Sequence, residues 1–472
     1  MQLKNHPFQH PLRVALHNEI HARPPEAMST PLAISHVVMV CDAAQREASR
    51  AHVVALLRDH HLPLPDAHTT HFRMDVGPFR LRWELHTEFV SWTFLRVLPS
   101  ASYAGDEPEP ALEVVPQDWF AALPGQCLAS LHLWALPKQD GAGGLVRHVL
   151  HEDSLVASGV AGGAGEVYTD FAIHADGFSR ILLFVDPLDS TSDAGAHMST
   201  AGPSQGVKAP SGGSAAHEVA SVGAHMTPRR LGRLVQRLLE IETYRMAALL
   251  GLPAAREASS ILGSAERELA ELAESIRTAT RNDEPRLLDR LTKLAGKVES
   301  QYASTHSRFS ASTAYFELVD KRIDDITESR LVGMQTIREF MDRRLSPARS
   351  TCDWVTRRQD ALSQRVSRIS NLLRTRVEIE QQQSSQALLA TMNQRQDLQL
   401  KLQSTVEGLS VAAITYYIVG LVSYLAKGAH SLGWPLSGET TAALAVPVVG
   451  FAVWWSLRKL HRKIVGHDGH ES

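Results

Sequence analysis

An uncharged, apolar segment near the C-terminus constrains this chain more than any other feature of its 472-residue sequence. Residues 408–426 read GLSVAAITYYIVGLVSYLA and contain no Asp, Glu, Lys or Arg. A helix of about 20 residues rises about 30 Å, which matches the hydrocarbon core of a lipid bilayer. The segment therefore predicts a membrane-spanning helix, and the other residues must fold outside that span.

A second apolar segment follows the first closely. Residues 440–457 are also uncharged and contain Trp454 and Trp455, and Arg458 and Lys459 open the basic sequence RKLHRK directly after them. Tryptophan at the membrane interface and Lys or Arg on the cytoplasmic side are typical of membrane helices. These four residues therefore predict the membrane interface of a second span.

The two segments together predict a C-terminal two-helix transmembrane hairpin at 408–457, with spans 408–426 and 440–457. By the positive-inside rule, the basic tail 458–472 lies in the cytoplasm, so the turn at 427–439 faces outward. The first residues, MQLKNHPFQHPLRV, lack the apolar core of a secretory signal. We therefore expect the bulk of the chain to be cytoplasmic.

The composition argues against several other classes of protein. Cys41, Cys127 and Cys352 are widely spaced and form no CxxC pair. This pattern favours a reducing compartment and speaks against both a disulfide framework and a structural zinc cluster. A formal net charge of −3 gives no basic footprint for a nucleic-acid partner.

The first part of the chain mixes strand patterns with short helical ones. Residues 33–40, AISHVVMV, are typical of a buried strand, and residues 79–97 alternate apolar and polar side chains as a pair of strands would. We therefore predict an α+β cytoplasmic domain at 1–186. Residues 187–227 are rich in Ser, Gly, Ala and Pro, a composition typical of a disordered linker or loop.

Helical periodicity begins after this Ser- and Gly-rich segment and defines a predicted long-helix stalk at 228–407. One helix begins at Pro228 and ends near Gly251, and further helical stretches are predicted at about 254–281 and 285–346. A last helix runs without proline or glycine from about residue 351 into the first span.

The last predicted helix carries a packing stripe typical of a coiled coil. Its cytoplasmic part would be on the order of 80 Å long, and a helix of that length needs neighbours from its own chain or from other subunits. We therefore expect a homo-oligomer. The stripe consists of Leu362, Val366, Ile369, Leu373 and Val377.

The same helix has an excess of positive charge. Residues 343–376 contain nine arginines and two aspartates. Arg376 precedes the first span by about 48 Å of helix, far beyond a Debye length of about 8 Å, so lipid headgroups do not explain the charge. We expect an acidic protein partner for this Arg-rich segment, and residues 266–274, ERELAELAE, are a candidate within the chain.

One charged pair is predicted to face the packed side of the first stalk helix. Glu242 and Arg245 are three residues apart and fall within the arc of the apolar residues around Leu234 and Leu238. The pattern favours a structural ion pair, with a contact between subunits as the alternative.

Two short stretches combine histidine with acidic residues and are candidates for metal ligands. In HNEIHARPP, a strand would place His17, Glu19 and His21 on one face, where they could bind a divalent metal. A helix fits the apolar residues better and places the two histidines one turn apart. The order HNEIH differs from the HExxH of metalloproteases, and we favour a structural role for the stretch.

The second stretch, HVLHEDS, contains His148 and His151. The fold could bring these histidines to the first stretch, or the segment could be a solvated turn, which is the interpretation we favour. Ser-His-Asp, Walker and GxSxG patterns do not stand out, and the glycine-rich residues 159–167 lack the Lys-Ser/Thr ending of a P-loop. Enzymatic activity is therefore not favoured, and neither a catalytic residue nor a cofactor is predicted.

Four segments resemble the signatures of a bacterial family of uncharacterised membrane-anchored proteins, a domain-of-unknown-function family. They are HNEIHARPP, YTDFAIHADGFSRILL, RLLEIETYRMAALLGLP and GLSVAAITYYIVGLVSYL. The resemblance covers nearly the whole chain apart from residues 187–227. It implies a cytoplasmic body with a C-terminal anchor in the bacterial inner membrane, and it supplies no reaction or substrate.

The order of the elements also resembles the layout of CorA-type magnesium channels. That family closes its pore-lining span with Gly-Met-Asn, whereas this chain has YLAKG at 424–428, and Lys427 would repel a divalent cation. The sequence therefore predicts a membrane-anchored scaffold or assembly module. The alternative is a CorA-like oligomeric ion channel or transporter that lacks the usual selectivity motif.

Overall fold

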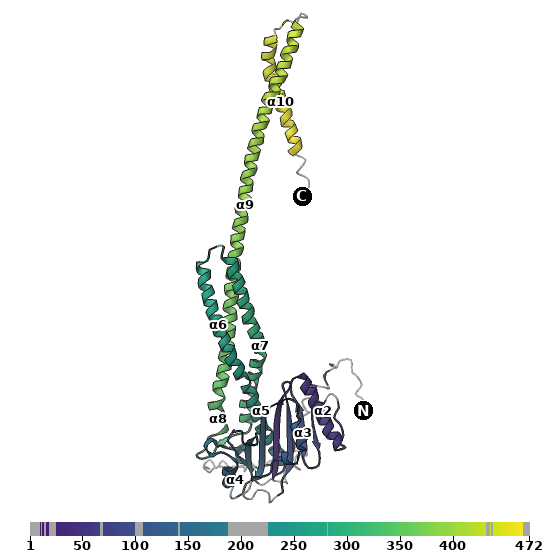
Figure 1. Ribbon diagram of the computed structural model, residues 1–472, viewed down its shortest axis with the longest axis vertical. Helices are drawn as coiled ribbons and strands as arrows, with labels where there is room; N and C mark the ends of the chain where they lie inside the picture. Colours follow the sequence, from purple (N-terminus) through teal and green to yellow (C-terminus); the bar gives the residue numbers. More distant parts are fainter. Residues whose placement is uncertain are drawn as a thin grey trace, which may run out of the picture. The chain divides into compact units, whose positions relative to one another are not determined.

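A nine-stranded mixed sheet forms the core of the N-terminal part of the chain (Figure 1). The strand order is β2-β3-β4-β1-β5-β8-β7-β6-β9, and neighbours are antiparallel except β5 and β8, which are parallel. The strands are β1 Leu32–Val40, β2 His71–Asp75, β3 Arg80–Leu85, β4 Phe89–Val97, β5 Gln126–Pro137, β6 Val156–Val160, β7 Gly165–Thr169, β8 Ser179–Val185 and β9 Ser329–Arg330.

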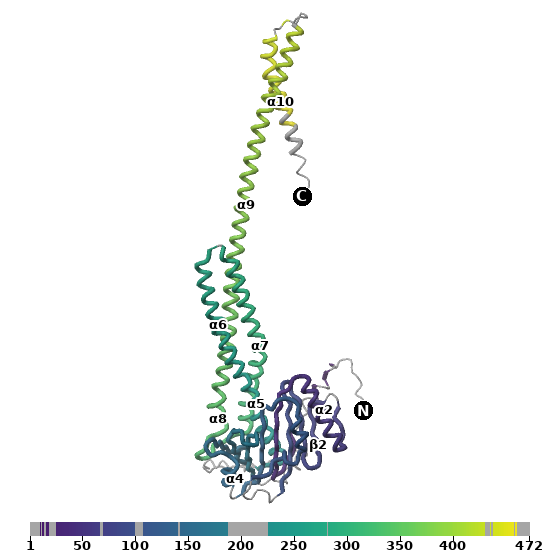
Figure 2. The backbone as a smooth tube through the Cα atoms, viewed as in Figure 1, coloured from purple at the N-terminus to yellow at the C-terminus, as the bar shows by residue number. Residues whose placement is uncertain are grey.

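Short helices belong to the sheet region, and long helices follow it. The short ones are α2 Ala43–Asp59, α3 Gln117–Ala121 and α4 Ala142–Val149, with 3-10 turns η1 Ala111–Val114, η2 Glu152–Ser154 and η3 Ala161–Gly163. The later ones are α5 Pro228–Leu249, α6 Gly251–Thr278, α7 Glu284–Asp325, α8 Ile337–Arg344, α9 Ser346–His430 and α10 Gly438–Val465. Figure 2 shows α9 as one uninterrupted helix.

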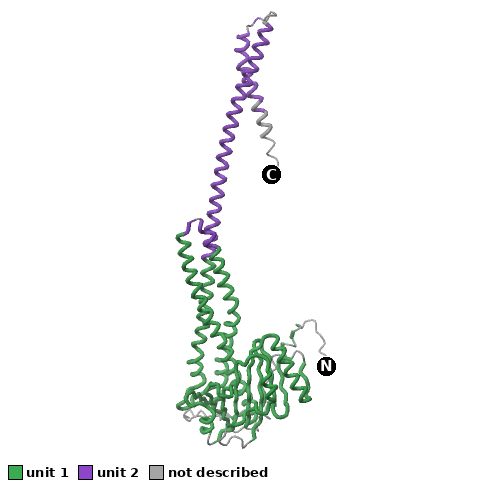
Figure 3. Tube along the Cα trace, in the orientation of Figure 1, with its two compact units in different colours: residues 1–278, 289–368 green, residues 279–288, 369–472 purple. Residues whose placement is uncertain are grey.

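These elements come from a computed structural model, which describes most of the chain. The residues outside the description are 1–9, 11, 14–15, 18–24, 67–68, 100–106, 140–141, 187–224, 281, 431–434, 436–437 and 466–472. The predicted linker at 187–227 therefore lies almost entirely outside the described residues. The chain forms two compact units, residues 1–278 with 289–368 and residues 279–288 with 369–472 (Figure 3).

The sheet buries a different apolar cluster on each face. Alternate residues of β1 point to opposite faces, so Ala33 and Val37 join one cluster with Trp92, while Leu32 and Ile34 join the other. A strand buried on both faces is almost wholly apolar, which is why AISHVVMV carries a strand signal without strict alternation.

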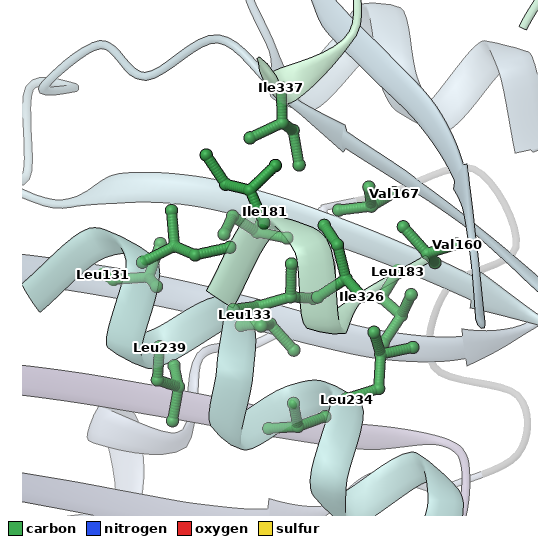
Figure 4. Close-up of a cluster of buried hydrophobic side chains, with 14 of the residues drawn as sticks. Leu131, Leu133, Val160, Val167, Ile181, Leu183, Leu234, Leu239, Ile326 and Ile337 are labelled. Carbon is green, nitrogen blue, oxygen red and sulfur yellow. The ribbon is translucent and has the colours of Figure 1, made fainter. Parts of the chain in front are cut away.

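The second cluster lies between the sheet and α5 (Figure 4). Leu131 and Leu133 of β5 and Ile181 of β8 pack with Leu234 and Leu239 of α5, and each is at most 5% exposed. Each such side chain contributes about 1.5–3 kcal/mol by leaving water. This packing fixes α5 on the sheet.

The start of α5 is fixed by capping and by a close crossing of the chain. The Thr227 side chain accepts from Arg230 N, and Pro228 occupies the first turn, where its missing N–H costs nothing. The Pro228 carbonyl accepts from Met28 N at 2.9 Å. Gly232 lets the backbone of Glu26 pass, since a Cβ at this position would lie 1.7 Å from the Glu26 carbonyl oxygen.

The structure confirms an α+β N-terminal region followed by long helices. The helix break predicted near Gly251 falls where α5 ends and α6 begins. Residues 79–97 form the predicted pair of strands, β3 and β4. These boundaries were predictable because turns and proline or glycine mark them locally.

The helical stretch predicted at 285–346 is wrong for residues 326–336, whereas residues 337–344 are helical again and form α8. α7 ends at Asp325, and the following residues pair with β6: Ala161 N donates to Ile326 O at 2.8 Å, and Ala157 N donates to Gln335 O at 3.0 Å. The β6 backbone groups thus find partners in this segment, which includes β9. Backbone hydrogen bonds to a distant strand therefore override the helical preference of the local sequence.

Among the described residues, one helical stretch is long and apolar enough to cross a membrane. It has the bounds Ile337–Ala429 and includes the first predicted span, and only 6% of its most apolar window is buried. The second predicted span, 440–457, lies in α10, where Pro447 is inside the helix. A two-helix transmembrane hairpin therefore stays a prediction.

Two glycine substitutions test the packing of α5. We expect Gly232→Ala to lower the free energy of unfolding by at least about 1–3 kcal/mol, because its methyl group would overlap the Glu26 backbone. Gly296→Ala in α7 is the matched control, because no atom lies within 4 Å of the added Cβ. Alanine there should stabilise the helix by about 0.5–1 kcal/mol. Chemical denaturation in mild detergent measures the free energy of unfolding of both variants. Equal changes in the two variants would contradict the close approach of the Glu26 backbone to Gly232.

Candidate functional site

Among the residues that the structure describes, one cluster of side chains could hold a metal ion. It consists of His151, Asp170 and His174. Three segments of the sheet region supply it: the residues after α4, the end of β7 and the turn before β8. One nitrogen of each histidine and one oxygen of Asp170 lie within 4.8 Å of one another. We call these three residues the carboxylate clamp.

Asp170 is the centre of the clamp. Its side chain is fully buried, and its Oδ2 lies 2.9 Å from His151 Nδ1 and 2.8 Å from His174 Nε2. Two backbone groups also donate to it, His151 N to Oδ2 at 3.0 Å and Ala172 N to Oδ1 at 3.1 Å. Because an ionised carboxylate only accepts hydrogen bonds, His174 Nε2 carries the proton of its hydrogen bond to Asp170.

The turn between β7 and β8 fixes the position of His174. His174 N donates to Phe178 O, and Gly177 N donates to His174 O, both at 2.9 Å. Gly177 has a φ of 85°, which glycine adopts without strain. This turn places His174 four residues after Asp170 and leaves its side chain only 9% exposed.

The arrangement of the two imidazole rings decides what the clamp can bind. The rings stack with centroids 4.4 Å apart and planes 10° apart. A metal ion lies near the plane of each imidazole that binds it, so two parallel stacked rings do not direct their lone pairs at one ion. The clamp is therefore a hydrogen-bonded carboxylate in this conformation. Metal binding would require loss of the proton on His174 Nε2 and rotation of His151, whose side chain is 58% exposed.

The predicted metal ligands that the structure describes, His17, His148 and His151, do not form one cluster. His151 is in the clamp, whereas His148 is exposed on α4 outside it. His17 is exposed, and Glu19 and His21 lie outside the described residues. Asp170 and His174 were missed by the sequence analysis, although an acid and a histidine four residues apart are a detectable signal.

The structure places Glu242 and Arg245 in contact within one chain. Arg245 donates through Nε and Nη2 to the two carboxylate oxygens, both at 2.6 Å, and Glu242 is 3% exposed. The Arg245 guanidinium lies 5.0 Å from the Phe171 ring centroid, and Ser179 Oγ donates to Glu242 at 3.4 Å. The two hydrogen bonds from Arg245, together with these neighbours, compensate the cost of burying the Glu242 carboxylate.

Several arginines of the Arg-rich segment have carboxylate partners within the chain. Arg349 pairs with Asp320 at 2.7 Å, and Arg358 pairs with Glu266 of the acidic stretch 266–274 at 2.5 Å. The side-chain hydrogen bond from Arg358 lowers the pKa of Glu266. An acidic partner from outside the chain stays a prediction.

The predicted interface residues lie together on α10. Trp454 and Trp455 are 45% and 59% exposed, and Lys459 is also exposed. The Arg458 guanidinium lies 4.9 Å from the Trp454 ring centroid, a cation–π contact.

Comparison with known proteins identifies a family and no function. A family model described as a protein of unknown function (DUF3422) matches residues 8–199 and 215–464. No curated protein and no solved structure matches the chain. The layout likeness to CorA-type channels therefore has no support from related sequences or structures.

The carboxylate clamp yields a prediction about stability and metal content. Asp170→Asn would place an amide N–H or a weaker acceptor opposite the His174 ring N–H and the two backbone N–H groups, and each lost charge-assisted hydrogen bond costs about 1.5–3 kcal/mol. We expect a lower melting temperature for this variant, and no change for Asp153→Asn, an exposed neighbour. We also expect purified protein to carry no stoichiometric divalent metal. A metal that disappears in His174→Ala would contradict the hydrogen-bonded interpretation.

Proposed function

From the premise that this chain belongs to the DUF3422 family of proteins of unknown function, we propose that it is a membrane-anchored assembly module at the bacterial inner membrane. Its α+β body works in the cytoplasm. The single observation that carries the proposal is the exposed apolar surface of α9 after residue 387.

The anchor part of this surface favours lipid over water. Residues 408–426 contain no charged side chain, and Leu409, Leu421 and Leu425 are 61–69% exposed. At about 25 cal/mol for each Å² of apolar surface, such side chains in water would be strongly unfavourable. A bilayer removes this cost.

A second span in α10 completes the proposed anchor. A Cβ on Gly450 would lie 3.7 Å from Thr415 Cγ2, so the backbone of α10 passes close to α9. Small residues allow such close approach of membrane helices. Trp454 and Arg458 then lie where an aromatic and basic interface is expected.

Reporter fusions test this topology. We expect a reporter fused after Ser472 to be active only if it works in the cytoplasm, because RKLHRK retains that end inside. A reporter inserted near Ser431 should be active only if it works outside. Export of the Ser472 fusion would refute the two-span arrangement, and a cytoplasmic signal at both positions would reject membrane crossing.

The part of α9 that leads into the anchor, from Leu388 to Leu409, carries a second apolar surface. Six large side chains, each 55–69% exposed, fall within an arc of about 120° at 100° per residue. No described segment covers them. We call them the 388–409 stripe: Leu388, Met392, Leu398, Leu402, Val406 and Leu409.

A second copy of the chain is the proposed partner of the 388–409 stripe. Leu388, Met392, Leu402, Val406 and Leu409 fit positions of one seven-residue repeat, in which spacings of three and four alternate. Identical helices anchored in one membrane are held parallel, so their stripes can face each other. Assembly through the stalk follows from this pairing.

Two pairs of substitutions with equal spacing test the assembly. Leu388→Glu with Leu402→Glu puts charges into the stripe, and each lost apolar contact costs about 1.5–3 kcal/mol. We expect the oligomer mass in mild detergent to fall to that of a smaller species. Ala390→Glu with Ser404→Glu adds the same charges on the opposite side of α9, where both residues are exposed, and should leave the mass unchanged. A wild-type monomer, or equal effects of both pairs, would refute the proposal.

A further inference from the structure

A row of polar side chains crosses the face of the sheet that packs on α5. The strand registers place Arg82 of β3 opposite Thr93 of β4, and Thr93 opposite His36 of β1. On the same face of β1, the neighbouring residues Ile34 and Val38 are in apolar clusters. The polar row is therefore a local interruption of an apolar layer.

Hydrogen bonds fix His36 in one neutral form. Thr243 Oγ1 donates to Leu239 O at 2.9 Å, so its contact with His36 Nε2 at 3.0 Å requires that the ring nitrogen donate. His36 Nδ1 then accepts from Thr93 Oγ1 at 2.8 Å. Burial lowers the pKa of His36 to about 3, which agrees with a neutral ring at physiological pH.

A cavity of about 190 Å³ lies between this row and α5 with α7. Its walls include Arg82 and Glu84 of β3, Gln236 and Glu240 of α5, and Arg322 of α7. Apolar wall is supplied by Phe89, Leu239 and the Tyr244 ring. The cavity thus offers both charged groups and apolar surface to one occupant.

Arg82 contributes a nearly buried charge to the wall of this cavity. The residue is 8% exposed, and its Nη2 donates to Glu84 Oε1 at 2.7 Å. Its Nε is buried and has no hydrogen-bond partner among the residues that the structure describes, at a cost of about 1–3 kcal/mol. The guanidinium charge therefore lies at the cavity with a single carboxylate partner from the described residues, Glu84.

The charges of the wall select the class of ligand. Two guanidinium groups, Arg82 and Arg322, are balanced by the carboxylates of Glu84 and Glu240, while His36 is neutral. Such a wall favours a molecule that is itself neutral overall but carries both signs of charge. Each carboxylate can accept about four hydrogen bonds. Glu84 and Glu240 can therefore accept a further hydrogen bond from a ligand ammonium group.

We infer that this cavity is a binding site for a small zwitterion of the size of an α-amino acid. The ligand carboxylate accepts from the Arg82 guanidinium group, and its ammonium group donates to Glu84 or Glu240. A dry cavity of about 150 Å³ holds benzene, so a volume of about 190 Å³ suits a ligand of about eight to ten non-hydrogen atoms. The site lies wholly within residues 1–278 and 289–368 and does not depend on the membrane anchor.

A thermal-shift panel on the full chain in mild detergent tests this site. The twenty standard amino acids are the probes, and we expect at least one to raise the melting temperature in proportion to its concentration. For the tightest binder, the carboxylate without the amino group and the amide without the carboxylate should both bind at least tenfold more weakly. Equal binding of the carboxylate analogue would overturn the zwitterion assignment, and no shift with any probe would overturn the site.

Matched variants locate the binding. Arg82→Lys keeps the charge but removes the planar guanidinium group, which can bind a carboxylate through two hydrogen bonds, and should weaken binding at least tenfold. Arg96→Lys, on β4 outside the cavity, should leave affinity unchanged. Ser91 lines the cavity, so the larger side chain of Ser91→Leu fills it and should abolish binding. This variant tests the location of the site even if Arg82→Lys does not fold. Undiminished binding in Ser91→Leu would place the ligand elsewhere and refute the inference.

Discussion

The packing of α5 on the sheet is the contact on which the rest of the α+β region depends. Leu231, Leu234, Val235 and Leu238 are each at most 2% exposed and form one face of the helix against β5 and β8. The face is continuous because apolar residues recur every three or four positions. Every other feature on this side of the sheet takes its position from that face.

The polar residues of α5 lie beside its apolar face. Gln236, Glu240 and Thr243 follow the helical repeat along one border of the buried stripe, so they reach the cavity while the helix stays packed. Glu242 lies on the packed side itself and is tolerated because Arg245 neutralises it through two hydrogen bonds. The helix thus combines core packing with a polar wall.

The buried polar groups differ in how completely they are satisfied. The Asp170 carboxylate accepts from two backbone donors and from the His174 imidazole, and His151 Nδ1 lies 2.9 Å from it, so the carboxylate clamp is satisfied without a ligand. Arg82, in contrast, retains a buried donor without a described partner. An unmade hydrogen bond in a low-dielectric interior is costly, so Arg82 carries a cost that the Asp170 carboxylate does not.

Local physics made much of this protein predictable from sequence. The uncharged residues 408–426, the strand AISHVVMV and the break at Gly251 each carry their signal within a few turns of chain, because hydropathy, alternation and glycine act locally. The pairing of residues 326–336 with β6 was not predictable, since it depends on hydrogen-bonding groups over 150 positions away in the chain. The same limit applies to the sites: Arg82, Thr93 and His36 become neighbours only through strand register, and Asp170 reaches His151 only when β7 is in the sheet. Composition and periodicity determined which segments leave water, and tertiary structure alone decided which polar groups meet, because strand register and helix packing are set by the whole core.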